Sequence, residues 1–364
     1  MIFVLQISAF TEYKRVCYVT NWSRFRETQA QFLPRMIDPF LCTHIVYTFA
    51  DLTATGNIYP DNEDSTEYDM YVQLNSLKNT NPKLKTILAI GGWVKGGKDF
   101  SDMAASSTAR SQFVQSAIAF LRQHEFDGIE ISWQFPGSRG GKAEDKTNFS
   151  LLLKVRSAIF KTFFYYQKVY FDLESEPKVL LSGRNSPHSR LSSLDQLGPK
   201  SMTCNLISFH SYLFYRYLDF ANLMTYDLRG SWEMTTGCNS PLYPRSNETS
   251  PERELNMDFV AKMWEQKGLP KEKMNIGFAT FGRSFKLEDV EDFGVGAPAE
   301  GPGGEGELTK QTGFLSYLEV SSRNRKPLPL TTTILGKINL NRNDFANECS
   351  GGEFPLISLA KERL

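Results

Sequence analysis

The stretch of the chain best suited to chemistry is residues 127–137, which read DGIEISWQFPG. Within it Glu130, Ser132 and Gln134 alternate with apolar residues, so on a β-strand their side chains share one face. If that face lines a barrel of parallel strands, the three polar groups lie successively nearer to the carboxyl ends of the strands, where barrel enzymes hold their active sites. An amphipathic strand end would give the same alternation, so the spacing alone indicates a candidate site only.

Short apolar runs recur along the chain and predict the strands that would position this site. Each run is almost continuously apolar, which indicates burial on both faces, as in a parallel sheet. Amphipathic segments separate the runs, and residues 105–124 and 257–267 predict helices. We therefore expect an α/β fold, a (β/α)8 barrel. The predicted strands are 13–22, 43–50, 84–93, 126–133, 179–182 (the weakest), 220–226 and 274–281.

The composition is that of a folded globular protein. The chain has 364 residues, of which 41% are hydrophobic and 13% aromatic, and this excludes a mainly disordered chain or a small disulfide-rich scaffold. Its 41 basic and 41 acidic side chains cancel, so no global charge draws it to nucleic acid or to an anionic membrane. No apolar run is long enough to cross a bilayer, and no cysteine pair has C-X-X-C spacing. We expect no nucleic-acid or membrane partner, no metal and no cofactor.

No segment has the composition of a linker between domains, so we expect residues 11–364 to form a single domain. Residues 292–308 are rich in Gly, Pro and Glu and predict a surface loop. Residues 1–10 are apolar but short and contain no Lys or Arg, so on their own they make a poor secretion signal.

Several strings of the chain are similar, in the same order, to glycoside hydrolase family 18, the family of the chitinases and chitinase-like lectins. FDGIEISWQFPG resembles the family's fourth-strand motif DGxDxDxE. The resemblance implies a (β/α)8 barrel with a small α+β insertion after strand seven, here truncated to a remnant at about 285–330. It also implies a secreted, extracellular protein. The other matching strings include CYVTNW, LCTHIVYTFA, LKTILAIGGW, MTYDLRGSWE, NSPLY and FATFGRSF.

The motif departs from the family pattern at the positions that carry the chemistry. Of its four polar positions only Asp127 is kept, while Glu130 and Ser132 replace aspartates and Gln134 replaces the catalytic Glu. In the family this Glu protonates the glycosidic oxygen, and the N-acetyl oxygen of the substrate attacks the anomeric carbon. An amide has no proton of usable pKa, so Gln134 can donate a hydrogen bond but cannot act as a general acid.

We therefore predict a catalytically inactive chitinase-like protein that binds chitin or N-acetylglucosamine oligosaccharides. Two alternatives remain open. In the first, the chain is an active chitinase whose displaced acid is Glu130, although by strand rise this residue lies about 13 Å of chain behind Gln134. In the second, the chain is a degenerate family member without a function.

The resemblance also implies a groove in which aromatic rings and a few polar side chains contact the sugar. An aromatic residue taken singly is more often part of a core, so only the motif match supports this role. The matching positions are Tyr18, Trp22, Phe49, Trp93, Phe135, Met224, Tyr226, Asp227, Trp232 and Arg283. Protein partners are not indicated.

The cysteines and the end of the chain complete the comparison with the family. The resemblance implies a disulfide between Cys17 and Cys42, and it leaves Cys349 unpaired because Ser321 stands at the position of its partner. It places an eighth strand at 335–345, with Ile338 where the family has a sugar-contacting Trp. Three Asn-X-Ser/Thr sequons begin at Asn21, Asn148 and Asn247.

Overall fold

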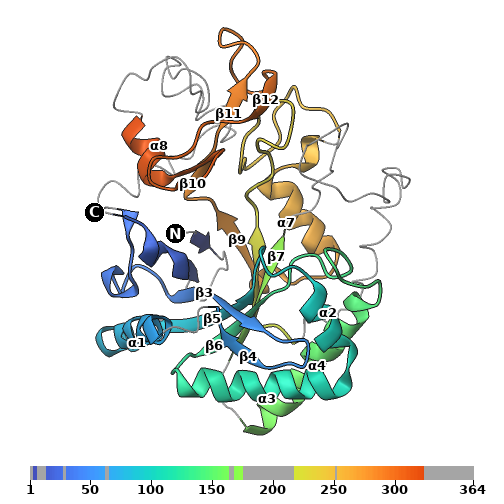
Figure 1. Cartoon of the computed structure of the whole chain (residues 1–364). Coiled ribbons are helices and arrows are strands. Elements are labelled where there is room, and N and C mark those ends of the chain that lie inside the picture. Colours follow the sequence, from blue (N-terminus) through green and yellow to red (C-terminus); the bar gives the residue numbers. More distant parts are fainter. Residues whose placement is uncertain are drawn as a thin grey trace. The chain divides into compact units, whose positions relative to one another are not determined.

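The computed structural model describes residues 3–5, 14–27, 30–61, 65–163, 168–174, 217–250 and 252–323 (Figure 1). These residues fall into two compact units. The first contains the described residues up to 174 together with 217–224 and 263–277. The second contains 225–262 and the described residues from 278 onward.

A closed, mostly parallel sheet forms the centre of the first unit. The strand order is β2-β1-β9-β8-β7-β6-β5-β3-β4, and a further pairing of β2 with β3 closes the ring. From β2 through β3, β5, β6, β7 and β8 to β9, every neighbouring pair is parallel, which confirms the predicted α/β barrel. The strands are β1 (Phe3–Leu5), β2 (Arg15–Thr20), β3 (His44–Leu52), β4 (Ile58–Pro60), β5 (Lys85–Gly91), β6 (Gly128–Ser132), β7 (Lys168–Glu174), β8 (Phe220–Met224) and β9 (Met274–Phe278).

The helices between these strands follow from amphipathic segments. In α3 (Ser107–Gln123) the buried positions Ala109, Phe113, Ala117 and Leu121 recur every four residues, and the Ser106 hydroxyl caps the helix by accepting from the N–H of Ala109. Figure 1 shows α3 beside α4. No helix among the described residues is long and apolar enough to span a membrane. The other helices are α1 (Ser65–Thr80), α2 (Lys98–Ala105), α4 (Asp145–Phe163), α7 (Met257–Gln266) and the 3-10 turns η1 (Asn21–Phe25), η3 (Pro34–Met36), η4 (Glu252–Glu254) and η5 (Lys271–Lys273).

Two predictions about the barrel strands need comment. The strand between β6 and β8 is β7, so the predicted position of the fifth strand at 179–182 was wrong. Residues 179–182 lie outside the described part of the chain, as do the predicted eighth strand at 335–345, Ile338 and Cys349. Within the described residues β1 lies between β2 and β9, and it is antiparallel to β2.

Small antiparallel pairs characterise the second unit. Strand β10 (Phe281–Arg283) pairs with β13 (Phe314–Ser316), and β11 (Phe285–Leu287) pairs with β12 (Ala299–Pro302); α8 (Tyr317–Arg323) follows β13. The segment 292–308 therefore contains a strand and is not only the loop we predicted. Its Gly and Pro residues mark the turns around β12, while the hydrogen bonds that define the strand come from β11. The single domain 11–364 and its insertion remnant stay predictions.

Candidate functional site

Strand β6 and the residues directly after it place the predicted polar face inside the protein. The side chains of Glu130 and Ser132 are 0% and 1% exposed, and Gln134, two residues beyond the strand, is 7% exposed. Gln134 therefore lies at the carboxyl end of a barrel strand, which is the end that carries active sites in this architecture.

Asp127 is the one motif position that matches the family, and it lies at the other end of β6. Its carboxylate accepts from the backbone N–H of Thr86 at 2.9 Å and pairs with Lys78 and Lys85 at 3.2 Å. Partial burial opposes ionisation, but the Thr86 hydrogen bond and the two lysines outweigh it and lower the pKa of Asp127. Asp127 therefore ties β6 to α1 and β5 and takes no part in a site at the carboxyl end.

Glu130 belongs to a buried hydrogen-bond network inside the barrel. Its Oε2 accepts from the Tyr18 hydroxyl at 2.8 Å and from Asn222 Nδ2 at 2.9 Å, and Asn275 Nδ2 donates to Asn222 Oδ1 at 2.8 Å. Complete burial raises the pKa of Glu130 to about 7, although the bonds from Tyr18 and Asn222 oppose this shift. Sequence reasoning missed Asn222 and Asn275, whose only signal is an amide in the middle of a buried apolar run.

The amide of Gln134 makes little use of its hydrogen-bonding capacity within the described residues. Its Nε2 lies 3.9 Å from the sulfur of Met224, a weak acceptor. Its Oε1 is buried without a hydrogen-bond partner in the described part of the chain, and so is the hydroxyl of Ser132. Buried polar atoms without partners cost free energy, so a polar ligand that reached them would be stabilised by pairing with them.

Two aromatic pairs stand near the carboxyl ends of neighbouring strands of the first unit. The ring of Trp22, which is 42% exposed, stacks on Phe49 with the centroids 6.2 Å apart. Trp93, which is 52% exposed, meets the edge of Phe135 at 6.3 Å. Tyr18, by contrast, is buried and uses its hydroxyl in the Glu130 network, so it offers no exposed ring.

Arg139 adds a feature that sequence reasoning did not predict. Its guanidinium carbon lies 3.9 Å from the centroid of the Trp93 ring, so it covers one face of the indole. Arg139 comes from the loop after β6, and the N–H of Gly97, in the loop after β5, donates to its carbonyl at 2.9 Å. A sugar that stacks on Trp93 must use the remaining surface or displace Arg139.

The backbone before Trp93 requires glycine. Gly91 and Gly92 have φ angles of 102° and 88°, in the left-handed region. A Cβ atom on Gly92 would approach the Phe49 ring to 2.7 Å. Beyond Trp93 the ammonium of Lys95 bridges Asp51 at 2.7 Å and Asp99 at 2.8 Å, which anchors the loop. These features hold Trp93 beyond the end of β5.

The predicted residues of the second unit form a cluster of their own. Arg283 Nε donates to Asp227 Oδ1 at 2.7 Å, and the guanidinium lies over the rings of Trp232 and Phe314 at 5.4 and 5.2 Å. Tyr226 is buried and contacts the edge of Phe281. Phe281 and Phe314, which stack on each other, are members of this cluster that are not among the predicted site residues.

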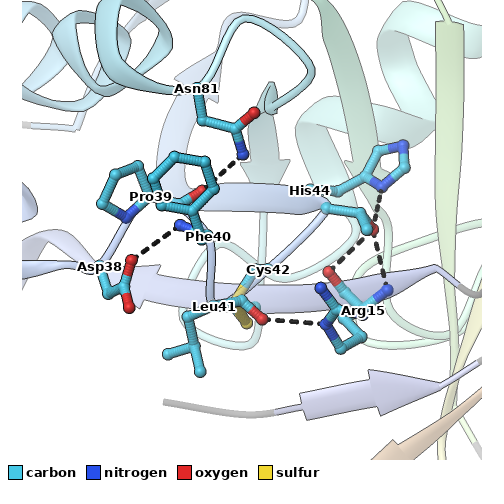
Figure 2. Close-up of a disulfide and its surroundings, with 10 residues drawn as sticks. Arg15, Asp38, Pro39, Phe40, Leu41, Cys42, His44 and Asn81 are labelled. Atoms are coloured by element: carbon cyan, nitrogen blue, oxygen red, sulfur yellow. Dashed lines mark hydrogen bonds between the residues drawn. A yellow bond between two sulfur atoms is a disulfide. The ribbon is translucent and has the colours of Figure 1, made fainter.

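The predicted disulfide between Cys17 and Cys42 is confirmed (Figure 2). The Cα atoms are 6.1 Å apart, within the range that a bridge requires. Arg15 Nε donates to the carbonyl of Leu41 at 3.0 Å, and Asn81 Nδ2 donates to that of Pro39 at 2.8 Å, so hydrogen bonds fix the segment around Cys42. Among the described residues no group of three or more His, Cys, Asp and Glu side chains could hold a metal ion.

A closed ring of strands, parallel from β2 through β3, β5, β6, β7 and β8 to β9, gives the chain a TIM-barrel fold, with Gln134 at the carboxyl end of β6. Residues 14–347 match the profile of glycosyl hydrolases family 18, and the chain belongs to that family.

Similar proteins include a chitotriosidase and a chitinase-like protein. The chain is 40% identical over 309 residues to chitotriosidase-1 of Mus musculus, covering 85% of this chain and 62% of that protein. It is 36% identical over 322 residues to chitinase-3-like protein 2 of Homo sapiens, covering 88% and 75%. The chain thus spans less than two thirds of chitotriosidase-1, and only 56% of the oviduct-specific glycoprotein of Sus scrofa.

The solved structures that are similar to this chain include a pseudo-chitinase and a chitinase. Human YKL-39, described as a pseudo-chitinase with retained chitooligosaccharide binding properties, is 32% identical with a TM-score of 0.70, covering 87% of this chain and 81% of that chain. The group IV chitinase of Ostrinia furnacalis is 29% identical with a TM-score of 0.72, covering 85% and 78%. This chain is therefore similar in structure to a chitinase and also to a pseudo-chitinase.

Proposed function

We propose that this protein binds chitooligosaccharides without cleaving them. The observation that carries the proposal is Gln134, a buried amide at the carboxyl end of β6 where the family motif has its acidic residue. An amide can donate to a glycosidic or acetamido oxygen and accept from an N–H, but it cannot deliver a proton to a leaving group. Gln134 can therefore contact a bound sugar, but it cannot catalyse hydrolysis as an acid.

Exposed indole surface supports the sugar-binding half of the proposal. Trp22 and Trp93 present rings from the loops after β2 and β5, and flat apolar surface suits the faces of a pyranose. Human YKL-39, which is described as retaining chitooligosaccharide binding as a pseudo-chitinase, is a precedent within the family. Burial of one ring contributes about 2 kcal/mol, and with Arg139 over Trp93 we expect a dissociation constant in the millimolar range, about −4 kcal/mol.

A second candidate function, hydrolysis with Glu130 as the acid, has one observation in its favour. The pKa of Glu130, raised by burial to about 7, would leave its proton available near neutral pH. Against it, the side chain is 0% exposed and its Oε2 is occupied by Tyr18 and Asn222. An acid must come within about 3 Å of the leaving oxygen, so a fully buried carboxyl is a poor candidate.

A titration tests the binding proposal. Chitotetraose is added to the full chain while tryptophan fluorescence and the heat of binding are followed. The proteins compared are wild type, Trp93→Ala and the control Val94→Ala. Val94 is next to Trp93 and is 96% exposed. We expect saturable binding in wild type and Val94→Ala, and a loss of roughly 30-fold in Trp93→Ala. Equal binding in all three proteins would place the sugar elsewhere, and no binding by folded protein would favour the degenerate alternative.

We also propose that the chain is secreted. The Cys17–Cys42 disulfide supports this, because disulfides form and persist in oxidising compartments.

A further inference from the structure

The three sequons differ in whether the structure can accept a glycan. The glycan is joined to the amide nitrogen Nδ2 of the asparagine, so this atom must be able to carry a large polar group without loss of packing. The structural surroundings differ among the three asparagines, Asn21, Asn148 and Asn247.

Asn21 is the least suitable of the three. It begins η1, its side chain is 3% exposed, and its Nδ2 donates to Asp61 Oδ2 at 3.0 Å. The sequon hydroxyl, that of Ser23, lies 2.7 Å from the carbonyl oxygens of both Thr20 and Phe32, so its one proton is used within the fold. A glycan on Asn21 would disturb its bond to Asp61 and could not be packed inside the fold, so we expect this sequon to stay unmodified.

Asn148 lies within α4, where the helix separates the two groups of the sequon. Its backbone N–H donates to the carbonyl of Glu144 at 2.9 Å, and its side chain is half-buried. The hydroxyl of Ser150 donates to the carbonyl of Lys146 at 3.2 Å. Helical residues two apart do not face each other, so the amide and the hydroxyl project to different sides.

Asn247 has neither obstacle. It lies in a turn with Ser246, and both Asn247 and the sequon residue Thr249 are exposed. The hydrogen bonds nearby belong to other groups. The N–H of Arg245 donates to Glu248 Oε2 at 2.9 Å, and that of Thr249 donates to Glu252 Oε2 at 3.3 Å. These bonds hold the turn in place and leave Asn247 exposed.

A second, independent observation concerns the compartment. The disulfide between Cys17 and Cys42 indicates folding in an oxidising lumen, and N-linked glycans are added in that part of the secretory pathway. We propose that Asn247 is an N-glycosylation site of this protein.

The reaction uses an oligosaccharide joined to a polyprenyl diphosphate as its co-substrate. The Asn247 Nδ2 forms a bond to the anomeric carbon of the first sugar while the bond from that carbon to the diphosphate oxygen breaks. The lipid diphosphate leaves with the electron pair, and the amide loses one proton. Glycosylation at Asn247 does not depend on whether the chain binds chitooligosaccharides.

The experiment is expression of the full chain through the secretory pathway of eukaryotic cells. Secreted wild type is treated with peptide N-glycosidase in heavy-oxygen water, which labels each asparagine that carried a glycan, and the labelled residue is located by peptide mapping. Four variants are run beside it on a denaturing gel: Asn247→Gln, Thr249→Ala, the conservative Thr249→Ser, which keeps the hydroxyl, and the control Asn148→Gln. Non-reduced mapping of the Cys17–Cys42 bridge verifies folding.

We expect the label at Asn247 and not at Asn21. The enzyme-sensitive mobility shift should be lost in Asn247→Gln and Thr249→Ala and kept in Thr249→Ser and Asn148→Gln. Secreted wild type without a label at Asn247, or a shift of unchanged size in Asn247→Gln, overturns the proposal. The mapping of wild type decides even if a variant is not secreted.

Discussion

The hydroxyl of Tyr18 donates a 2.8 Å hydrogen bond to Oε2 of Glu130, although β2 and β6 are not neighbours in the barrel sheet. Asn222 on β8 donates to the same carboxylate oxygen and lies 2.6 Å from the Tyr18 hydroxyl. The interior of the barrel is therefore joined by polar contacts between three strands. Because these contacts are buried, the protonation state of Glu130 should affect the stability of the whole barrel.

We predict that Glu130→Gln removes a pH dependence of stability. Burial raises the pKa of Glu130 from 4.5 to about 7, so between these values the folded protein holds a proton that the unfolded chain has released. The contribution of Glu130 is therefore greatest below pH 4.5 and falls as the pH rises to about 7, by roughly 3 kcal/mol at most. Gln keeps an oxygen to accept from Tyr18 and Asn222 but does not titrate.

Urea unfolding of wild type and Glu130→Gln at a series of pH values measures this difference. The free energy of unfolding of wild type should fall relative to that of the variant as the pH rises from 4.5 to 7. A difference that stays constant across this range would show that Glu130 titrates with an ordinary pKa.

Hydrolysis gives the second prediction. Wild type should release no product from a chromogenic chitobioside above the blank, because Gln134 cannot donate a proton. Gln134→Glu should restore only part of the activity, since Ser132 still stands where the family has an aspartate. Gln134→Glu combined with Ser132→Asp should exceed the single variant. Full activity from Gln134→Glu alone, or wild-type turnover that Glu130→Ala abolishes, would show that our interpretation of the motif is wrong.

Arg139 gives the third prediction. Its guanidinium covers one face of Trp93, and an exposed cation–π contact is worth about 0.5 to 1 kcal/mol. If the sugar needs that face, Arg139→Ala should tighten chitotetraose binding by up to roughly 5-fold, and Arg139→Lys should have a smaller effect. Calorimetry measures the change, and Lys142→Ala, which removes an exposed cation from the same loop, is the control. Weaker binding in Arg139→Ala would mean that the guanidinium itself contacts the sugar.

The disulfide gives the fourth prediction. Cys17 and Cys42 are 25 residues apart, and closing a loop of this length stabilises the folded state by roughly 3.5 kcal/mol in the chain-entropy model. The double variant Cys17→Ala, Cys42→Ala should lose about this much free energy of unfolding in urea. Reducing agent should lower the stability of wild type by more than that of the double variant, because only wild type has the Cys17–Cys42 bridge to lose. Equal stability of wild type and the double variant would contradict the prediction.

The sequence by itself determined the family, the parallel barrel and most of its strands. The runs 43–50 and 84–93 fall on β3 and β5, because a strand buried on both faces must be apolar along its length. The alternation in 127–137 predicted that Glu130, Ser132 and Gln134 share one face of a strand, and the structure shows that all three are buried. The lack of an acidic proton on Gln134 is a property of the residue type and needs no structure.

Only the tertiary structure decided which groups these side chains meet. Tyr18, Asn222 and Asn275 reach the centre of the barrel from strands far apart in the sequence, and no local pattern encodes which strands become neighbours. The contact of Arg139 with Trp93 depends on the paths of two loops, which the glycines and the bond from Gly97 to Arg139 fix. We misplaced the fifth strand at 179–182 because its position depends on which segment pairs with β6 and β8. Burial leaves a periodic signal in the sequence, whereas pairing between distant segments depends on the closed sheet in which each strand finds its neighbours.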